Sequence, residues 1–222
     1  MKKLFLVLAL VSVVFAFPMY ANADTLQIGG AYTSPIFLVE TAGSTTTYLA
    51  EGGGSVDVSY LNGVKLNYMY CVDLFKEVYV PGTYAATVVN NSGNIYGSPL
   101  NNAGKVAWLL SNYGTAGQGE EAYALQAAIW HVIFEGTGTT IGLDTTKSTT
   151  KEVSLYNNYL LALGSNTGNV SNFLWITPGT KDSNGNLTQY QGQVASVPEP
   201  TSILLLGLGL IGLAGIGRKF KK

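Results

Sequence analysis

The alternation of apolar and polar positions predicts a chain rich in β-strands. Val56 to Leu61 and Val64 to Val72 are alternating runs joined by Asn62-Gly63. Asn-Gly is the preferred two-residue hairpin turn because both positions adopt positive φ. This hairpin would place Cys71 near the end of its second strand. Further strands are expected at residues 26–28, 36–39, 46–49, 83–89, 172–176 and 187–191, with a turn at 182–185.

A helical period appears in three stretches, which are residues 103–112, 122–134 and 150–163. Asn101 or Asn102 would cap the first helix and Gly114 would end it. Thr149 and Glu152 have the spacing of a capping box at the start of the third. We therefore expect an α+β fold, in which a β-rich domain of hairpins or a barrel-like sheet carries two to three short helices.

The helix predicted at 122–134 contains one polar residue that does not suit a buried face. Leu125 and Ile129 recur at helical spacing and mark the apolar side. Gln126 shares a side with Trp130 and Ile133, which directs its amide toward the interior. A buried amide needs a hydrogen-bonding partner, so Gln126 is a candidate functional residue.

The N-terminal residues 1–23 have the pattern of a secretory signal peptide. Lys2 and Lys3 precede an apolar run from Leu4 to Phe17, and Ala21-Asn22-Ala23 is a small-x-small cleavage site. Signal peptidase would then release a mature chain beginning near Asp24, outside the cytoplasm. The alternative is that the segment is retained as an N-terminal anchor.

The C-terminal residues 195–222 are also patterned. Val197-Pro198-Glu199-Pro200 precedes an apolar segment, 203–216, and a basic tail that would stay in the cytoplasm. This arrangement closely resembles the PEP-CTERM sorting signal. The resemblance implies a Gram-negative bacterium in which the segment holds the chain transiently in the inner membrane. An exosortase-type transpeptidase would then release the protein or transfer it to the cell surface or extracellular matrix. A simple tail anchor is the alternative.

Residues 24–194 would form one extracellular domain, with a short linker at Gln193 to Ser196. The two terminal segments contain six of the twelve basic residues but only one of the thirteen acidic residues. The part between Asp24 and Val197 therefore has a net charge of −6. Binding to nucleic acid is not expected, because it requires clustered Lys and Arg to neutralise phosphates.

The chain contains one cysteine, Cys71, and one histidine, His131. Cys71 cannot form an internal disulfide, so it is an inert buried thiol, an intermolecular bridge or a protected reactive group. Catalysis by a Ser/His/Asp or Cys/His site would depend on His131, and a multi-histidine metal site is excluded. We expect no metal and no cofactor.

Cys71 and Gln126 together could form an internal thioester. A thiolate can attack a glutamine side-chain amide and expel ammonia, which leaves an electrophile held in reserve. Tyr70-Cys71-Val72 and Leu125-Gln126-Ala127-Ala128-Ile129-Trp130 resemble the two motifs of the bacterial thioester domains found in surface adhesins. Tyr70 and Trp130 would line the reactive pocket. This sequence departs from that family in its PEP-CTERM-like tail and in having no stalk of further domains.

The resemblance implies a secreted or surface-displayed protein for adhesion or matrix attachment. A lysine amine or a carbohydrate hydroxyl of a target would attack the Gln126 carbonyl and become covalently bound. Because each thioester reacts once, this would not be a turnover enzyme. One alternative is a non-covalent exopolysaccharide-associated or carbohydrate-binding module with an inert Cys71. Another is a hydrolase that uses Cys71 and His131.

Overall fold

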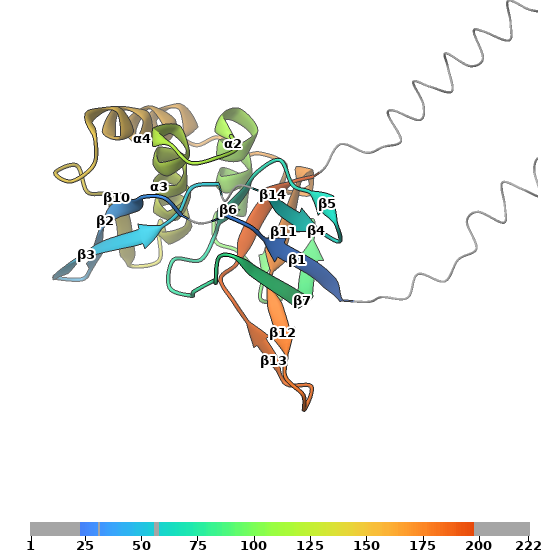
Figure 1. The fold of residues 1–222 in the computed structure, drawn as a ribbon. Coiled ribbons are helices and arrows are strands. Elements are labelled where there is room, and N and C mark those ends of the chain that lie inside the picture. The colour runs from blue at the N-terminus through green and yellow to red at the C-terminus, as the bar shows by residue number, and fades with distance from the viewer. Residues whose placement is uncertain (1–22, 31, 56–57, 198–222) are drawn as a thin grey trace, which may run out of the picture.

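The computed structural model describes residues 23–30, 32–55 and 58–197, which form a β-rich domain with α-helices on one side (Figure 1). The main sheet has seven strands in the order β5-β4-β1-β7-β11-β14-β6. Residues 66–68 alone connect β5 to β6, the two edge strands, so the sheet curls into a half-barrel. The expected α+β class is confirmed. The strands are β1 Asp24–Ile28, β4 Ser59–Leu61, β5 Val64–Lys65, β6 Met69–Cys71, β7 Gly82–Asn90, β11 Phe173–Thr177 and β14 Gln193–Ser196.

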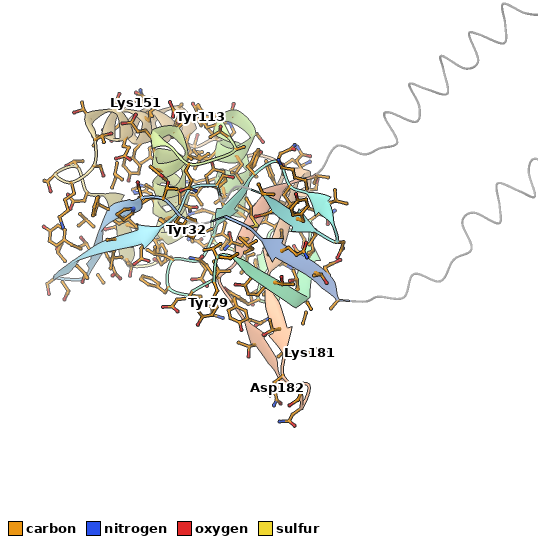
Figure 2. All side chains as sticks on the ribbon, in the orientation of Figure 1. Tyr32, Tyr79, Tyr113, Lys151, Lys181 and Asp182 are labelled. Atoms are coloured by element: carbon orange, nitrogen blue, oxygen red, sulfur yellow. The ribbon has the colours of Figure 1, made fainter. Side chains whose placement is uncertain are left out.

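Three smaller sheets and the helices complete the described part. The sheet β10-β2-β3 consists of β10 Thr139–Leu143, β2 Pro35–Ala42 and β3 Thr45–Gly52. The two hairpins pair β8 Asn94–Ile95 with β9 Ser98–Pro99, and β12 Gly179–Lys181 with β13 Leu187–Gln189. The second hairpin projects away from the helices, with Lys181 and Asp182 at its tip (Figure 2). The helices are α2 Ala103–Tyr113, α3 Glu120–Phe134, α4 Thr150–Leu163 and the 3₁₀ turn η1 Val170–Asn172.

Helix α3 is the central helix of the domain. It contacts α2, α4, β2 and β10, and from Ala122 to Ile133 only His131 is not fully buried. The larger hydrophobic core lies around this helix and includes Trp130 and Trp175. A second core, with Leu26 and Ile28, belongs to the half-barrel sheet. Because the stretch from Ala122 to Trp130 is buried on all sides, a polar side chain within it needs a partner within the protein.

The Asn62-Gly63 turn forms as predicted, with φ values of 50° and 77°. The second hairpin strand, however, ends at Lys65, and the prediction that Cys71 lies on this hairpin is wrong. Cys71 ends β6, which pairs with β14 at the far edge of the sheet. The strand is interrupted after Lys65 because Leu66 and Met69 both pack into the second core. Residues three apart on one continuous strand would point to opposite faces.

One other local prediction fails, and the predicted cap of the first helix is right in its position, Asn102, but not in its hydrogen bond. Gln193 to Ser196 are not a linker but the strand β14, paired with β11 and β6. Asn102 precedes α2 in the left-handed conformation without a capping side-chain bond, and its amide donates instead to the Val132 carbonyl near the end of α3. The capping box of Thr149 and Glu152 is confirmed.

The predicted signal peptide and most of the sorting signal fall outside the described residues. The structure describes Ala23 and Val197 but not residues 1–22 or 198–222, so Pro198, Glu199 and Pro200 are not described. Among the residues that it does describe, no helix is long and apolar enough to cross a membrane. Strand β1 begins at Asp24, the predicted first residue of the mature chain.

Candidate functional site

The structure brings Gln126 into direct contact with Cys71. The backbone N–H of Cys71 donates to Gln126 Oε1 at 2.9 Å, and Gln126 Nε2 donates to the Cys71 carbonyl at 2.8 Å. Neither residue is exposed to solvent. The inward amide of Gln126 therefore has both of its polar atoms satisfied by the backbone of one residue.

The position of Cys71 at a sheet edge makes this contact possible. Strand β6 pairs with β14 on one side only, with Cys71 opposite Gln193. The N–H of Val72 bonds to Gly192, so Val72 faces β14 while the backbone groups of Cys71 point the other way. The Gln126 side chain occupies that free edge. Cys71 and Gln193 therefore face each other without backbone hydrogen bonds between them. In such a pair the two side chains lie close together, so the Gln193 side chain lies beside the thiol.

The Cys71 thiol lies among three polar side chains. Sγ donates to Gln191 Oε1 at 3.1 Å. Because the single thiol hydrogen is used there, the Tyr32 hydroxyl at 3.4 Å is the donor in its contact with Sγ. Gln193 Nε2 also donates to Sγ, at 3.5 Å. The sulfur therefore accepts hydrogen bonds from two neutral donors.

Burial controls the acidity of the thiol. It raises the pKa of Cys71 to about 11, while the hydrogen bonds from Tyr32 and Gln193 act in the opposite direction. The negative charge of Asp73 raises this pKa further. At neutral pH the free thiol stays protonated. The two donors to Sγ lower the free-energy cost of ionising the thiol in this buried site.

The segment that carries Gln191 is fixed by hydrogen bonds. Gln191 Nε2 donates to the Asp73 carbonyl at 2.7 Å, and Gln193 Nε2 donates to Gln191 Oε1 at 3.3 Å. The hydroxyl of Tyr96 accepts from the Gly192 N–H at 2.8 Å and contacts Asp73 Oδ2 at 2.7 Å. These contacts hold the two glutamines in place around the sulfur.

Of the two predicted pocket residues, Trp130 lies beside the reactive pair. A Cβ built on Gly53 would lie 2.8 Å from Gln126 Cγ and 3.0 Å from Trp130 Cη2, so these groups meet at Gly53. Tyr70 is fully buried, and its hydroxyl donates to the Thr115 carbonyl at 2.9 Å. Its side chain leaves β6 on the face opposite to that of Cys71. Tyr32, rather than Tyr70, contacts the sulfur.

A cavity of about 400 Å³ opens next to the thiol. Tyr32 and Gln191, two of the residues in contact with Sγ, form part of its lining. The carboxylates of Glu51 and Glu77 also line it, and burial followed by the charge of Glu77 raises the pKa of Glu51. The cavity gives a solute a path from solvent toward the buried site. Its other lining residues are Gly52, Leu74, Phe75, Lys76, Val78 and Tyr79.

His131 is directed away from Cys71. Its Nδ1 lies 2.7 Å from the carbonyl oxygen of Ile141 and 3.0 Å from the hydroxyl of Tyr156. The carbonyl can only accept, so Nδ1 carries the proton and donates to it. These contacts join α3 to β10 and α4. The geometry therefore gives no support to a hydrolase built from Cys71 and His131.

Comparisons with known proteins give one match over the region that contains Cys71 and Gln126 and another over the C-terminal pattern. Residues 68–166 match the family model described as a thioester domain, and residues 196–219 match that of the PEP-CTERM protein-sorting motif. No curated protein and no solved structure gives a significant match. The chain thus carries a thioester domain followed by a PEP-CTERM motif. The two matches indicate a surface-exposed protein with covalent attachment capacity, and the thioester-domain family is one that binds its targets covalently rather than turning them over.

The matched segment 68–166 contains Cys71 and Gln126 but omits three residues in contact with the sulfur. Tyr32 lies before it, and Gln191 and Gln193 lie after it. None of the three was expected from the sequence. The only signal in the sequence was the pair of glutamines in Gln191-Gly192-Gln193, which alternate as strand residues on one face do.

Proposed function

We propose that Cys71 and Gln126 form an internal thioester through which the protein binds a target covalently. The observation that carries this proposal is the pair of hydrogen bonds between the Gln126 amide and the Cys71 backbone. They hold the amide beside the residue that supplies the nucleophile. Both groups are buried, so water is kept from the bond that would form.

Thioester formation follows from this arrangement. Sγ attacks Cδ of Gln126, the Cδ–Nε2 bond breaks, and the nitrogen leaves as ammonia after it has taken up the thiol proton. Negative charge develops on Oε1 during the attack. The Cys71 N–H already donates to that oxygen at 2.9 Å and would stabilise the charge as an oxyanion-hole donor does.

The target nucleophile that the cavity best suits is a primary amine such as a lysine side chain. Glu51 and Glu77 present carboxylates at the cavity, while Lys76 lies over the ring of Tyr96, 3.8 Å from its centroid. A cationic side chain would be attracted to these carboxylates, whereas a carbohydrate hydroxyl carries no charge. The product would be an amide between the target and Gln126, with Cys71 released as a thiol.

The route of the protein to the surface is part of the proposal. Signal peptidase would remove residues 1–23, and the extracellular domain would extend from residue 24 to the end of β14 at Ser196, two residues beyond the predicted boundary at 194. The segment that follows would hold the chain in the inner membrane until an exosortase-type enzyme cuts near Val197-Pro198-Glu199-Pro200. The PEP-CTERM match supports this processing.

Covalent capture of an amine probe tests the proposed function. Mature wild-type protein incubated with biotin cadaverine should retain the label in denaturing gels. Cys71→Ala and Gln126→Ala should remain unlabelled. Equal labelling of all three proteins, or of none, would contradict a thioester at this site.

Two exposed aromatic rings support a second candidate function. Phe75 and Tyr79 line the cavity and are 58% and 63% exposed, as suits stacking on sugar rings. A non-covalent exopolysaccharide-binding module would use these rings and leave Cys71 inert. Cys71→Ala would then bind polysaccharide as the wild type does, and denaturant would dissociate the complex.

A further inference from the structure

Cys71 Sγ has polar neighbours whose arrangement matters for a second chemical step. The Tyr32 hydroxyl and Gln193 Nε2 both donate to this sulfur, at 3.4 Å and 3.5 Å. They come from distant parts of the chain, Tyr32 from the loop between β1 and β2 and Gln193 from β14. Gln193 is buried, and its Oε1 has no hydrogen-bond partner among the residues that the structure describes, so packing alone does not account for a polar side chain here.

We propose that Tyr32 and Gln193 form a donor pair that binds Cys71 Sγ as it leaves the thioester with negative charge. Tyr32 would be a catalytic residue for the opening of the thioester, because its hydroxyl touches the departing atom. This inference rests on the proposed function and adds to it the residues that release the bound sulfur.

The amine nitrogen forms a bond to Cδ of Gln126, the Cδ–Sγ bond breaks, and its electron pair goes to Sγ. The nitrogen gives up one proton, and Sγ finally takes one up to become the free thiol. Gln191 Oε1 accepts a hydrogen bond from that thiol at 3.1 Å, which is the arrangement seen in the structure.

The leaving group needs such help because it departs into a buried site. Burial raises the pKa of the Cys71 thiol to about 11, and a thiol of high pKa leaves slowly. Burial also raises the pKa of Tyr32 well above its ordinary value, so its hydroxyl keeps the proton that it donates. A slow, donor-dependent departure would preserve the thioester until a target arrives.

The position of Tyr32 connects the donor to the entry path. Its side chain lines the cavity that also contains Glu51 and Gln191. Figure 2 shows Tyr32 near the middle of the domain, with Tyr79, another residue of the same cavity, below it. A nucleophile that enters the cavity therefore meets the residue that holds the leaving sulfur.

The variants Tyr32→Phe and Tyr48→Phe test the proposal. Both remove one tyrosine hydroxyl, but only that of Tyr32 touches Sγ, whereas Tyr48 is an exposed residue of β3 that does not line the cavity. Each protein is first checked by mass for the loss of ammonia and then opened with methylamine. We expect Tyr32→Phe to open at least about tenfold more slowly, since removal of one oxyanion-hole donor costs roughly 10²-fold or more. Tyr48→Phe should open at the wild-type rate.

A second measurement does not require the thioester. In Gln126→Ala protein, the pH dependence of Cys71 alkylation reports the pKa of the thiol. Adding Tyr32→Phe or Gln193→Met should raise that pKa, because each removes a donor to the thiolate, whereas Tyr48→Phe should not change it.

The outcomes separate the two proposals. A wild-type protein of full mass overturns the thioester and the leaving-group role together. Ammonia loss in the wild type with unchanged opening of Tyr32→Phe overturns the donor pair alone. If Tyr32→Phe does not fold, an unchanged thiol pKa in Gln193→Met overturns the donor pair, and a raised pKa supports it.

Discussion

The side chain of Gln126 pairs with the backbone of Cys71 as a neighbouring strand would, accepting from its N–H and donating to its carbonyl. A helix thereby completes the free edge of a sheet through one amide. The same contact serves two purposes. It satisfies a polar group in the buried part of α3, and it holds a carbonyl carbon next to the residue that carries the nucleophile.

Gly53→Ala should displace the reactive glutamine. The added Cβ would lie 2.6 Å from Ile36 Cδ1 and 2.8 Å from Gln126 Cγ, which is closer than real contacts allow. We expect a loss of about 1–3 kcal/mol in the free energy of unfolding and a smaller fraction of molecules that lose ammonia. Gly142→Ala is the control, because its Cβ would meet only Tyr156 Oη at 3.7 Å. Equal behaviour of the two variants would show that Gln126 does not depend on Gly53.

The free thiol should make stability depend on pH in the alkaline range. In Gln126→Ala protein, burial raises the pKa of Cys71 from 9.0 to about 11 in the folded state. The folded protein therefore binds this proton more tightly than the unfolded chain does. Its contribution is fully present below about pH 9 and is lost as pH rises toward about 11. Urea titrations should show this decline relative to the double variant Cys71→Ala/Gln126→Ala, and parallel pH profiles would argue against a thiol buried in this way.

His131→Ala should weaken the fold without affecting the thioester. The ring joins the Ile141 carbonyl to the Tyr156 hydroxyl, and loss of these hydrogen bonds costs roughly 1–2 kcal/mol of unfolding free energy. Ammonia loss and amine capture should stay at wild-type levels. Thermal melts and intact mass measure the two effects. Loss of amine capture in a folded His131→Ala protein would indicate a catalytic role for the histidine.

Neutralising the cavity carboxylates should slow the reaction with cationic amines. Glu51→Gln/Glu77→Gln removes the charges that attract a protonated amine, so labelling by cadaverine should fall severalfold at low salt and less at high salt. Neutral hydroxylamine should react at the wild-type rate. Glu40→Gln, on β2 and not among the residues that line the cavity, is the matched control. Unchanged selectivity between the two nucleophiles would remove the basis for an amine target.

Local sequence patterns predicted those parts of the fold that a single short stretch of sequence determines. The positive φ values required by Asn62-Gly63 and the capping box of Thr149 and Glu152 are of this kind. Strand pairing was harder to predict from the sequence because it depends on distant parts of the chain. Leu66 and Met69 enter the same core, so the hairpin ends before them and Cys71 lies at the opposite edge of the sheet. Nothing in residues 64–72 alone predicts this packing.

The candidate site likewise contains residues that the sequence predicted and residues that it could not predict. Cys71 and Gln126 could be paired from sequence because each lies in a motif and no other cysteine competes. Tyr32, Gln191 and Gln193 could not, because their role comes from a loop and a strand that meet only in the folded domain. A buried strand of four residues such as β14 is also too short to show an alternating pattern clearly.

Intact mass of the mature protein tests the central claim most directly. After removal of the signal peptide, the wild-type chain should weigh one ammonia less than its sequence, and Cys71→Ala and Gln126→Ala should each have their full mass. Methylamine should convert the wild type to a single adduct and release one thiol that can be alkylated. A wild-type protein of full mass, whose only cysteine can be alkylated after unfolding without amine treatment, would contradict the thioester.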